Sequence, residues 1–123
     1  MSVESLILVV EDNPDNAQLV TWILEDEGYS VDLAETAELG LDMLAKSDYS
    51  LILMDISLPG MDGKEAMTII RSNPRFQSIP IIAVTAHAVL GEKDAIIASG
   101  ADMLVTKPII EEDLLSAISK ILD

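Results

Sequence analysis

Short runs of mostly apolar residues alternate along the chain with longer segments in which apolar residues recur every three or four positions. The runs cover residues 6–10, 30–34, 51–54, 79–84 and 103–106. They are too short for helices, and near-continuous apolar character is typical of strands buried in a parallel sheet. The pattern therefore predicts five strands. The second lies nearer the sheet edge, because Asp32 interrupts its apolar character.

The segments between the runs predict helices. Asn13 and Thr36 are residue types that cap helix N-termini, and Pro14 suits a first helical position. Gly28 and Gly100 stand where two of the periodic segments stop, as expected of glycine after a helix. The expected buried faces comprise Ala17, Val20 and Leu24; Ala37, Leu41 and Leu44; Ala66, Met67 and Ile70; and Leu114, Ile118 and Ile121. The fourth helix, over residues 88–99, is only weakly amphipathic.

Strand and helix alternate five times, which predicts an α/β fold with helices on both faces of a parallel sheet. A length of 123 residues fits one domain over 1–123. Half of the residues are apolar but only 3% are aromatic, so the core must be mainly aliphatic.

The charge and the cysteine content exclude several classes of function. With 22 acidic and 7 basic residues the formal net charge is -15, which argues against direct nucleic-acid binding and suits a basic protein partner or a divalent cation. The absence of cysteine excludes disulfides and thiolate metal sites, and a cytoplasmic location fits. No apolar run suggests a signal peptide or a membrane span, so we expect no membrane association.

Polar residues of complementary chemistry follow four of the predicted strands. Glu11 and Asp12 follow the first, Asp55 the third, Thr85 the fourth and Lys107 the fifth. The carboxyl ends of parallel strands meet at one sheet edge, where ligands bind. One such Asp alone could simply cap a strand end, but polar ends on four strands favour a site with Asp55 as its working residue.

The residue types indicate phosphoryl transfer. Carboxylates crowded at one edge repel one another unless a cation lies between them, and Mg²⁺ prefers such oxygen ligands while also meeting phosphate. Lys107 offers a point charge and Thr85 a hydroxyl to a phosphoryl oxygen. A carboxylate nucleophile completes the set, so Asp55 is predicted to become an aspartyl phosphate.

These residues carry a family resemblance. The chain resembles the receiver domain of two-component response regulators, in particular the chemotaxis receiver, through Glu11-Asp12, the segment MDISLPGMDG around Asp55, the segment AVTA around Thr85, and Lys107-Pro108. The resemblance implies a flavodoxin-like sheet of strand order 2-1-3-4-5. It also implies a phosphorelay switch rather than an enzyme in the ordinary sense, although one that catalyses its own phosphorylation and dephosphorylation.

The resemblance also assigns roles. Asp55 would accept a phosphoryl group from a sensor histidine kinase or a histidine phosphotransfer protein, and the phosphorylated form would bind a downstream protein. Asp12 and Asp55, with the backbone carbonyl of Ser57, would bind Mg²⁺, while Glu11 would act mainly through metal-bound water. Thr85 and Lys107 would hold the phosphoryl oxygens, and the peptide bond before Pro108 would be cis.

Three residues stand outside this pattern. Leu104 occupies a position where the family often has Tyr or Phe as a rotamer switch, so an aromatic switch is not expected. His87 is either an incidental loop residue or one that tunes phosphoryl lifetime. Trp22 is predicted to be partly buried packing rather than a binding anchor.

Two other interpretations compete. An aspartyl-phosphate phosphomonoesterase would share the Asp, Mg²⁺, Thr and Lys, but it would need a second Asp where this chain has Ser57, and a cap insertion. The chain could also be a receiver excised from a longer hybrid kinase. We expect instead a free-standing regulator that acts by binding a partner.

Overall fold

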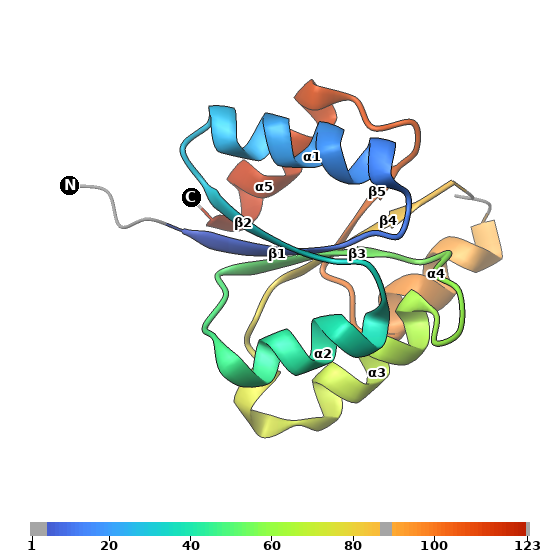
Figure 1. The fold of residues 1–123 in the computed structure, drawn as a ribbon. Helices are drawn as coiled ribbons and strands as arrows, with labels where there is room; N and C mark the ends of the chain where they lie inside the picture. The colour runs from blue at the N-terminus through green and yellow to red at the C-terminus, as the bar shows by residue number, and fades with distance from the viewer. Residues whose placement is uncertain (1–4, 87–89, 123) are drawn as a thin grey trace.

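The computed structural model describes residues 5–86 and 90–122 (Figure 1). In it, strands and helices alternate as the sequence predicts. The elements are β1 (Leu6–Val10), α1 (Pro14–Asp26), β2 (Ser30–Ala34), α2 (Ala37–Lys46), β3 (Leu51–Asp55), α3 (Gly63–Ser72), a 3-10 turn η1 (Pro74–Phe76), β4 (Ile81–Thr85), α4 (Leu90–Ala98), β5 (Met103–Thr106) and α5 (Glu111–Leu122).

The sheet is wholly parallel and its strand order is β2-β1-β3-β4-β5, which confirms the predicted flavodoxin-like topology. Helices α1 and α5 cover one face, and α2, α3 and α4 cover the other (Figure 1). From β1 the chain moves to one side to form β2 and then returns to the other side as β3. The carboxyl ends of β1 and β3 therefore flank the switch point where ligands bind in such sheets.

Two aliphatic clusters hold the helices to the sheet. Successive residues of a strand point to opposite faces, so Val9 and Leu53 pack under α1 and α5, whereas Val10 and Met54 pack under α2 and α3. Strands β3 and β4 are buried along their whole length. Burial of each such aliphatic side chain contributes roughly 1.5–3 kcal/mol. The central strands therefore form a rigid base for whatever their ends present.

Helix ends follow the predicted signals, with one addition. The side chains of Asn13 and Thr36 accept hydrogen bonds from the backbone N–H groups of Asn16 and Leu39, at 3.0 and 3.1 Å. Gly28 and Gly100 adopt positive φ angles of 91° and 130°. At α3 the cap is Asp62, whose Oδ1 accepts from Glu65 N at 2.9 Å. That cap was not among the predicted ones.

Strand β4 begins later than predicted. Strand β4 begins at Ile81 rather than at residue 79, because Pro80 has no N–H to give and the Ile79 carbonyl accepts from Arg71 instead. The predicted start of the fourth helix at residue 88 lies outside the described residues. Among the residues described, none of the helices has both the length and the apolar character needed to cross a bilayer.

The prediction for Trp22 was wrong. Its side chain is 61% exposed, so it is not part of the core. Helix α1 buries Val20, Ile23 and Leu24 against the sheet. At 100° per residue Trp22 lies about 200° from Val20 around the helix, and so it faces away from that side.

Candidate functional site

All the predicted site residues lie at the carboxyl edge of the sheet. Glu11 and Asp12 directly follow β1, Asp55 ends β3, Thr85 ends β4, and Lys107 directly follows β5. Glu11, Asp55 and Thr85 are almost completely buried, whereas Asp12 is exposed. Asp12 is thus the one of the three acids that faces solvent.

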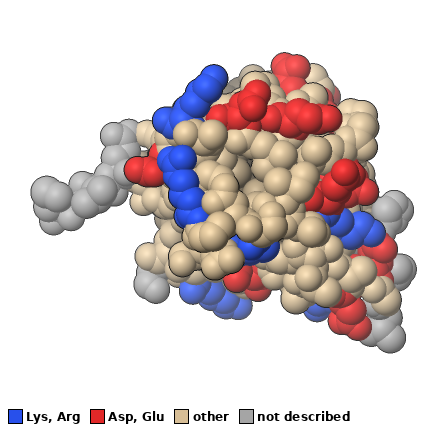
Figure 2. All heavy atoms as spheres, turned by 90° about the horizontal axis from the view of Figure 1, so that it is seen from below, with Lys and Arg blue, Asp and Glu red and all other residues tan. Residues whose placement is uncertain are grey.

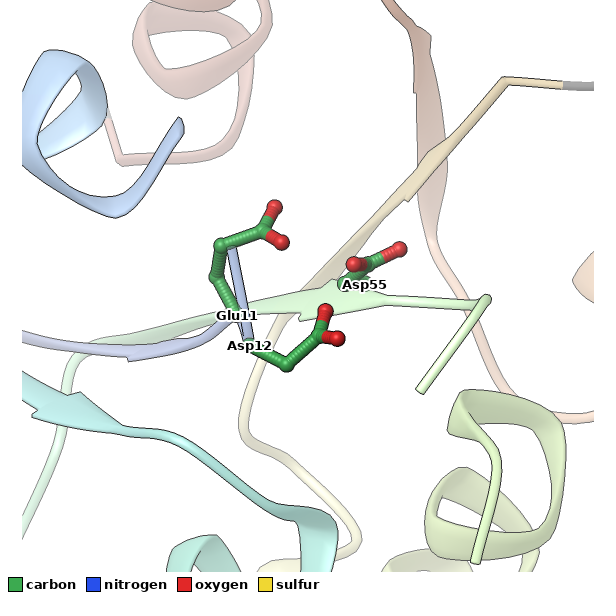
Figure 3. A group of neighbouring side chains, drawn as sticks. All are labelled: Glu11, Asp12 and Asp55. Carbon is green, nitrogen blue, oxygen red and sulfur yellow. The ribbon is translucent and has the colours of Figure 1, made fainter. Parts of the chain in front are cut away.

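The three acids form one cluster at the switch point. One carboxylate oxygen from each of Glu11, Asp12 and Asp55 lies within 4.8 Å of the other two. Figure 3 shows the side chains rising from the neighbouring ends of β1 and β3, with their carboxylates turned toward a common space. An all-oxygen donor set with one open side has the chemistry that Mg²⁺ requires.

Both oxygens of Asp55 have a partner. Ser57 N donates to Oδ1 at 3.0 Å, and Lys107 Nζ donates to Oδ2 at 3.1 Å. Lys107 Nζ also lies 3.4 Å from Glu11 Oε1, so a single ammonium bridges the two buried acids. These contacts fix the orientation of the Asp55 carboxylate.

The charge state of Lys107 follows from the same contacts. Burial alone would lower its pKa, but the hydrogen bond and attraction from Asp55, together with attraction from Glu11, outweigh burial and raise the pKa above its ordinary value. The ammonium is therefore charged throughout the physiological range.

Glu11 behaves differently from an ordinary carboxylate. Burial and a hydrogen bond with Asp55 raise its pKa to about 7, against the lowering effect of the Asn13 N–H, which donates to Glu11 Oε2 at 3.1 Å. In the metal-free protein near neutral pH, Glu11 therefore holds a proton for much of the time. Sharing that proton relieves part of the repulsion within the cluster.

Backbone contacts tie the strand ends together behind the side chains. Ile56 N donates to Val84 O at 3.0 Å, and Lys107 N donates to Thr85 O at 2.8 Å. The peptide bond between Lys107 and Pro108 is cis, as the resemblance implied. The ends of β3, β4 and β5 are thus connected to one another by backbone hydrogen bonds.

Gly63 is a supporting residue that the sequence analysis did not recognise. Its N–H donates to Ile56 O at 3.2 Å, and a Cβ at this position would collide with the backbone of Asp55 and Ile56. The absence of a side chain lets the first turn of α3 pack directly on the end of β3. The only available sequence signal was a glycine at the start of a helix directly after its cap.

The model of the response regulator receiver domain family matches residues 7–119. The chain belongs to this family. Membership argues against the phosphomonoesterase interpretation and connects the acidic edge with two-component signal transduction. Receiver domains bind Mg²⁺ at an acidic site, and the cluster of Glu11, Asp12 and Asp55 is an acidic site of that kind.

Relatives and solved structures agree with the family. This receiver domain is 39% identical over 117 residues to the sensor protein GacS of Pseudomonas syringae pv. syringae; the match covers 93% of this chain and 13% of that protein. Vibrio cholerae CheY4, a chemotaxis protein, superimposes with a TM-score of 0.92 at 28% identity, covering 98% of this chain and all of that one. The receiver domain of the sensor histidine kinase PA1611 from Pseudomonas aeruginosa, whose active-site cleft coordinates a magnesium ion, gives a TM-score of 0.89 at 31% identity and covers 97% and 98% of the two chains.

The structure describes Leu104 but not His87. Leu104 lies on β5, opposite Ala83 of β4, and packs half-buried against the cluster under α2, α3 and α4. An aliphatic residue thus fills the position at which the family often has an aromatic one. His87 lies outside the described residues, so both of its interpretations stay open.

Proposed function

We propose that Asp55 is the phosphoacceptor of this receiver domain and that its phosphorylation controls binding to a protein partner. The observation that carries the proposal is the environment of Asp55: a buried carboxylate held by Lys107 and by Ser57 N, beside two further acids at the open edge. We further propose that residues 1–123 act as one receiver domain, because the two aliphatic clusters that hold the helices draw on all five helices and the central strands.

Mg²⁺ would be held by Asp12 and Asp55, with the backbone carbonyl of Ser57, while Glu11 would act through a metal-bound water. The oxygen donors within 4.8 Å of one another and the exposure of Asp12 support this assignment. When bound, the ion supplies positive charge that offsets the carboxylates and the phosphoryl oxygens. The positive charge of the ion would favour the ionised form of Glu11 over the protonated form.

The transfer step requires little more than positioning. A carboxylate oxygen of Asp55 attacks the phosphorus of a phosphohistidine on a sensor kinase or a phosphotransfer protein. The P–N bond breaks and its electron pair leaves with the imidazole, which takes up a proton. Lys107 exchanges its contact with Asp55 for one with a phosphoryl oxygen, and Thr85 donates its hydroxyl to another.

Phosphorylation then changes the forces on three strand ends. The acyl phosphate carries close to two negative charges in place of the single charge of the carboxylate, and Lys107 and Thr85 are drawn toward the new oxygens. Because the strand ends are linked by backbone hydrogen bonds, the loops after β4 and β5 follow. A partner that contacts those loops can distinguish the two states.

The test is a measurement of intact mass after exposure to Mg²⁺ and a small acyl-phosphate donor. We expect one phosphoryl adduct on the wild type that hydroxylamine removes, and none on Asp55→Asn. Addition of EDTA should suppress the adduct. An adduct of equal yield on Asp55→Asn would mean that another residue is the acceptor.

A further inference from the structure

A groove of about 580 Å³ runs along α1 beside the acidic edge of the sheet. One of its walls is the face of α1 formed by residues 14–25. Across the open edge of the sheet, the opposite wall comprises Leu33 of β2 and Leu39 of α2. Figure 1 shows α1 and α2 on opposite sides of the sheet at the edge that β2 forms. We call this feature the α1 groove.

The lining of the α1 groove includes three large apolar side chains that remain exposed in the fold. Trp22 is 61% exposed, and Leu33 and Leu39 are each 43% exposed. The three come from three different elements and line the same groove. A Trp among aliphatic side chains is the composition typical of a binding anchor.

The rim of the α1 groove is acidic. All eleven of its lining residues lie in the described part of the chain, and among them four are acids and none is Lys or Arg. Two of the acids, Glu11 and Asp12, belong to the acidic cluster of the candidate site, and the other two are Glu25 and Glu35. On the face seen from below, acidic and basic side chains both occur around a largely uncharged centre (Figure 2).

The acidic rim limits which kind of partner the α1 groove can bind. A second copy of the chain would bring its own net charge of -15 against the rim, and a phosphate backbone or an anionic membrane would be repelled in the same way. A cationic segment would be attracted, and its apolar side chains would cover Trp22. The partner must therefore combine Lys or Arg with an apolar stripe.

The shape of the groove favours a helix. The α1 positions that line it, Pro14, Ala17, Gln18, Thr21, Trp22 and Glu25, recur at three- and four-residue intervals. They form one continuous helical face about 16 Å long, at 1.5 Å per residue. A second helix laid along such a face packs with its axis roughly 8–10 Å away. Its apolar stripe would then meet Trp22 and Leu39, and its flanks would meet Glu25 and Glu35.

We propose that the α1 groove docks a basic amphipathic helix of a protein partner. The inference goes beyond the phosphoacceptor role and stands without it, because Asp55 is not among the residues that line the groove. It assigns a binding role to Trp22, Leu33 and Leu39, whose exposure the fold itself does not require.

Trp22 provides the measurement, because it is the only tryptophan in the sequence. The ligand is a synthetic, tryptophan-free helix of about 18 residues, five turns, with a Leu stripe flanked by Lys. Titration in EDTA should shift Trp22 emission to shorter wavelength with saturation at one peptide per chain. The matched peptide with Glu in place of Lys should not bind, and added salt should weaken the binding of the Lys peptide.

Substitutions in the α1 groove test whether the peptide binds there. Glu25→Gln combined with Glu35→Gln should weaken binding by about fivefold, and Leu39→Ala by about tenfold. The controls are Asp94→Asn on α4 and Ile69→Ala on α3, an exposed acid and an exposed apolar residue outside the groove, and they should change affinity by less than about twofold. Circular dichroism checks the fold of Leu39→Ala, and the paired charge variant tests the site without altering any apolar contact.

The outcomes separate this proposal from the phosphoacceptor role. Asp55→Asn should bind the peptide like the wild type, and the groove variants should still take a phosphoryl group from a small donor. Equal binding of the Lys and Glu peptides, unchanged affinity in the groove variants, or no saturable shift up to about 1 mM peptide would each overturn the docking proposal. Sedimentation showing a dimer that buries Trp22 would overturn it as well. None of these results would touch the assignment of Asp55.

Discussion

Lys107 Nζ lies 3.1 Å from Asp55 Oδ2, although 52 residues of chain separate the two. The contact joins the ends of β3 and β5, and β4 lies between them in the sheet. A buried carboxylate is thus neutralised by an ammonium that is itself partly open to solvent. This ion pair orients the Asp55 carboxylate. An anion of higher charge, such as a phosphoryl group, would compete with Asp55 for the Lys107 ammonium.

Asp55→Asn should leave the fold intact and raise the free energy of unfolding of the metal-free protein. The substitution removes one of three crowded carboxylates while keeping a side chain of the same size. Thermal unfolding in EDTA measures the change, which we expect to be about 1 kcal/mol. The amide loses part of the Lys107 contact, so a marked loss of stability would show that this ion pair outweighs the repulsion.

Asp12→Asn should weaken Mg²⁺ binding more than Glu11→Gln does. In the proposed site Asp12 is a direct charged ligand, whereas Glu11 acts through water, and loss of such an outer contact typically costs 10–100-fold in metal affinity. Calorimetric titration with MgCl₂ compares the two variants with the wild type. A larger loss in Glu11→Gln would place Glu11 among the direct ligands.

The raised pKa of Glu11 predicts how the stability of the metal-free protein depends on pH. The folded state keeps the Glu11 proton up to about pH 7, whereas an unperturbed Glu releases it near 4.5. Between these values the folded state binds more protons than the unfolded state. The contribution of Glu11 to stability is therefore present below about pH 4.5 and is lost as the pH rises through 7, by up to about 1.4 kcal/mol per pH unit.

Glu11→Gln isolates this effect from the other carboxylates, which titrate in both proteins. We expect the difference in free energy of unfolding between wild type and Glu11→Gln, measured in EDTA, to shift in favour of the variant from pH 5 to pH 8. A difference that stays constant over this range would mean that Glu11 is already ionised at pH 5.

The sequence predicted the strand ends well because that inference depends only on local pattern and chain direction. Apolar runs locate the strands, and a parallel sheet then brings Asp55 and Lys107 to one edge. Trp22 was misassigned because an exposed aromatic residue in an otherwise amphipathic helix departs from the pattern on which the inference relies. Gly63 and Arg71 could not be assigned, since their importance depends on backbone groups that only the folded chain brings near them.

Arg71 is the clearest case of a residue whose role the sequence conceals. Its guanidinium donates to the carbonyl oxygens of Phe76, Gln77, Ile79 and Gly100 at 2.7 to 3.2 Å, and to Asp102 Oδ2 at 2.9 Å. Asp102 Oδ2 also accepts from Ile81 N at 2.9 Å, so the pair connects the end of α3 with the start of β4 and the turn before β5. The planar fork of Arg suits this set of acceptors, and Lys does not have the same geometry.

Arg71→Lys should therefore lower the free energy of unfolding by about 2–4 kcal/mol, because several partly buried carbonyls lose their donor. The matched control is Arg75→Lys. The Arg75 guanidinium is about half exposed; it pairs with Asp48 at 3.7 Å, donates one hydrogen bond to Ala45 O at 3.2 Å and lies over the Phe76 ring, so the loss of stability should stay below about 1 kcal/mol. Urea unfolding compares the two variants. Similar small losses in both would show that water replaces the Arg71 contacts at little cost.

Gly63→Ala tests whether the packing of α3 on the end of β3 sets the geometry of the acidic cluster. The added Cβ would meet the Asp55 carbonyl oxygen, the Ile56 Cα and the Asp55 carbonyl carbon, all of them backbone atoms that cannot move aside by changing rotamer. Either α3 or the end of β3 must shift, and we expect a loss of about 1–3 kcal/mol of stability together with weaker Mg²⁺ binding.

Gly91→Ala is the control, because this glycine lies in α4 with nothing within 4 Å of an added Cβ. Alanine favours a helix over glycine by roughly 1 kcal/mol, so the control should be neutral or slightly stabilised. If Gly63→Ala lost stability but bound Mg²⁺ like the wild type, the end of β3 would be held by the sheet alone and α3 would play no part in shaping the site.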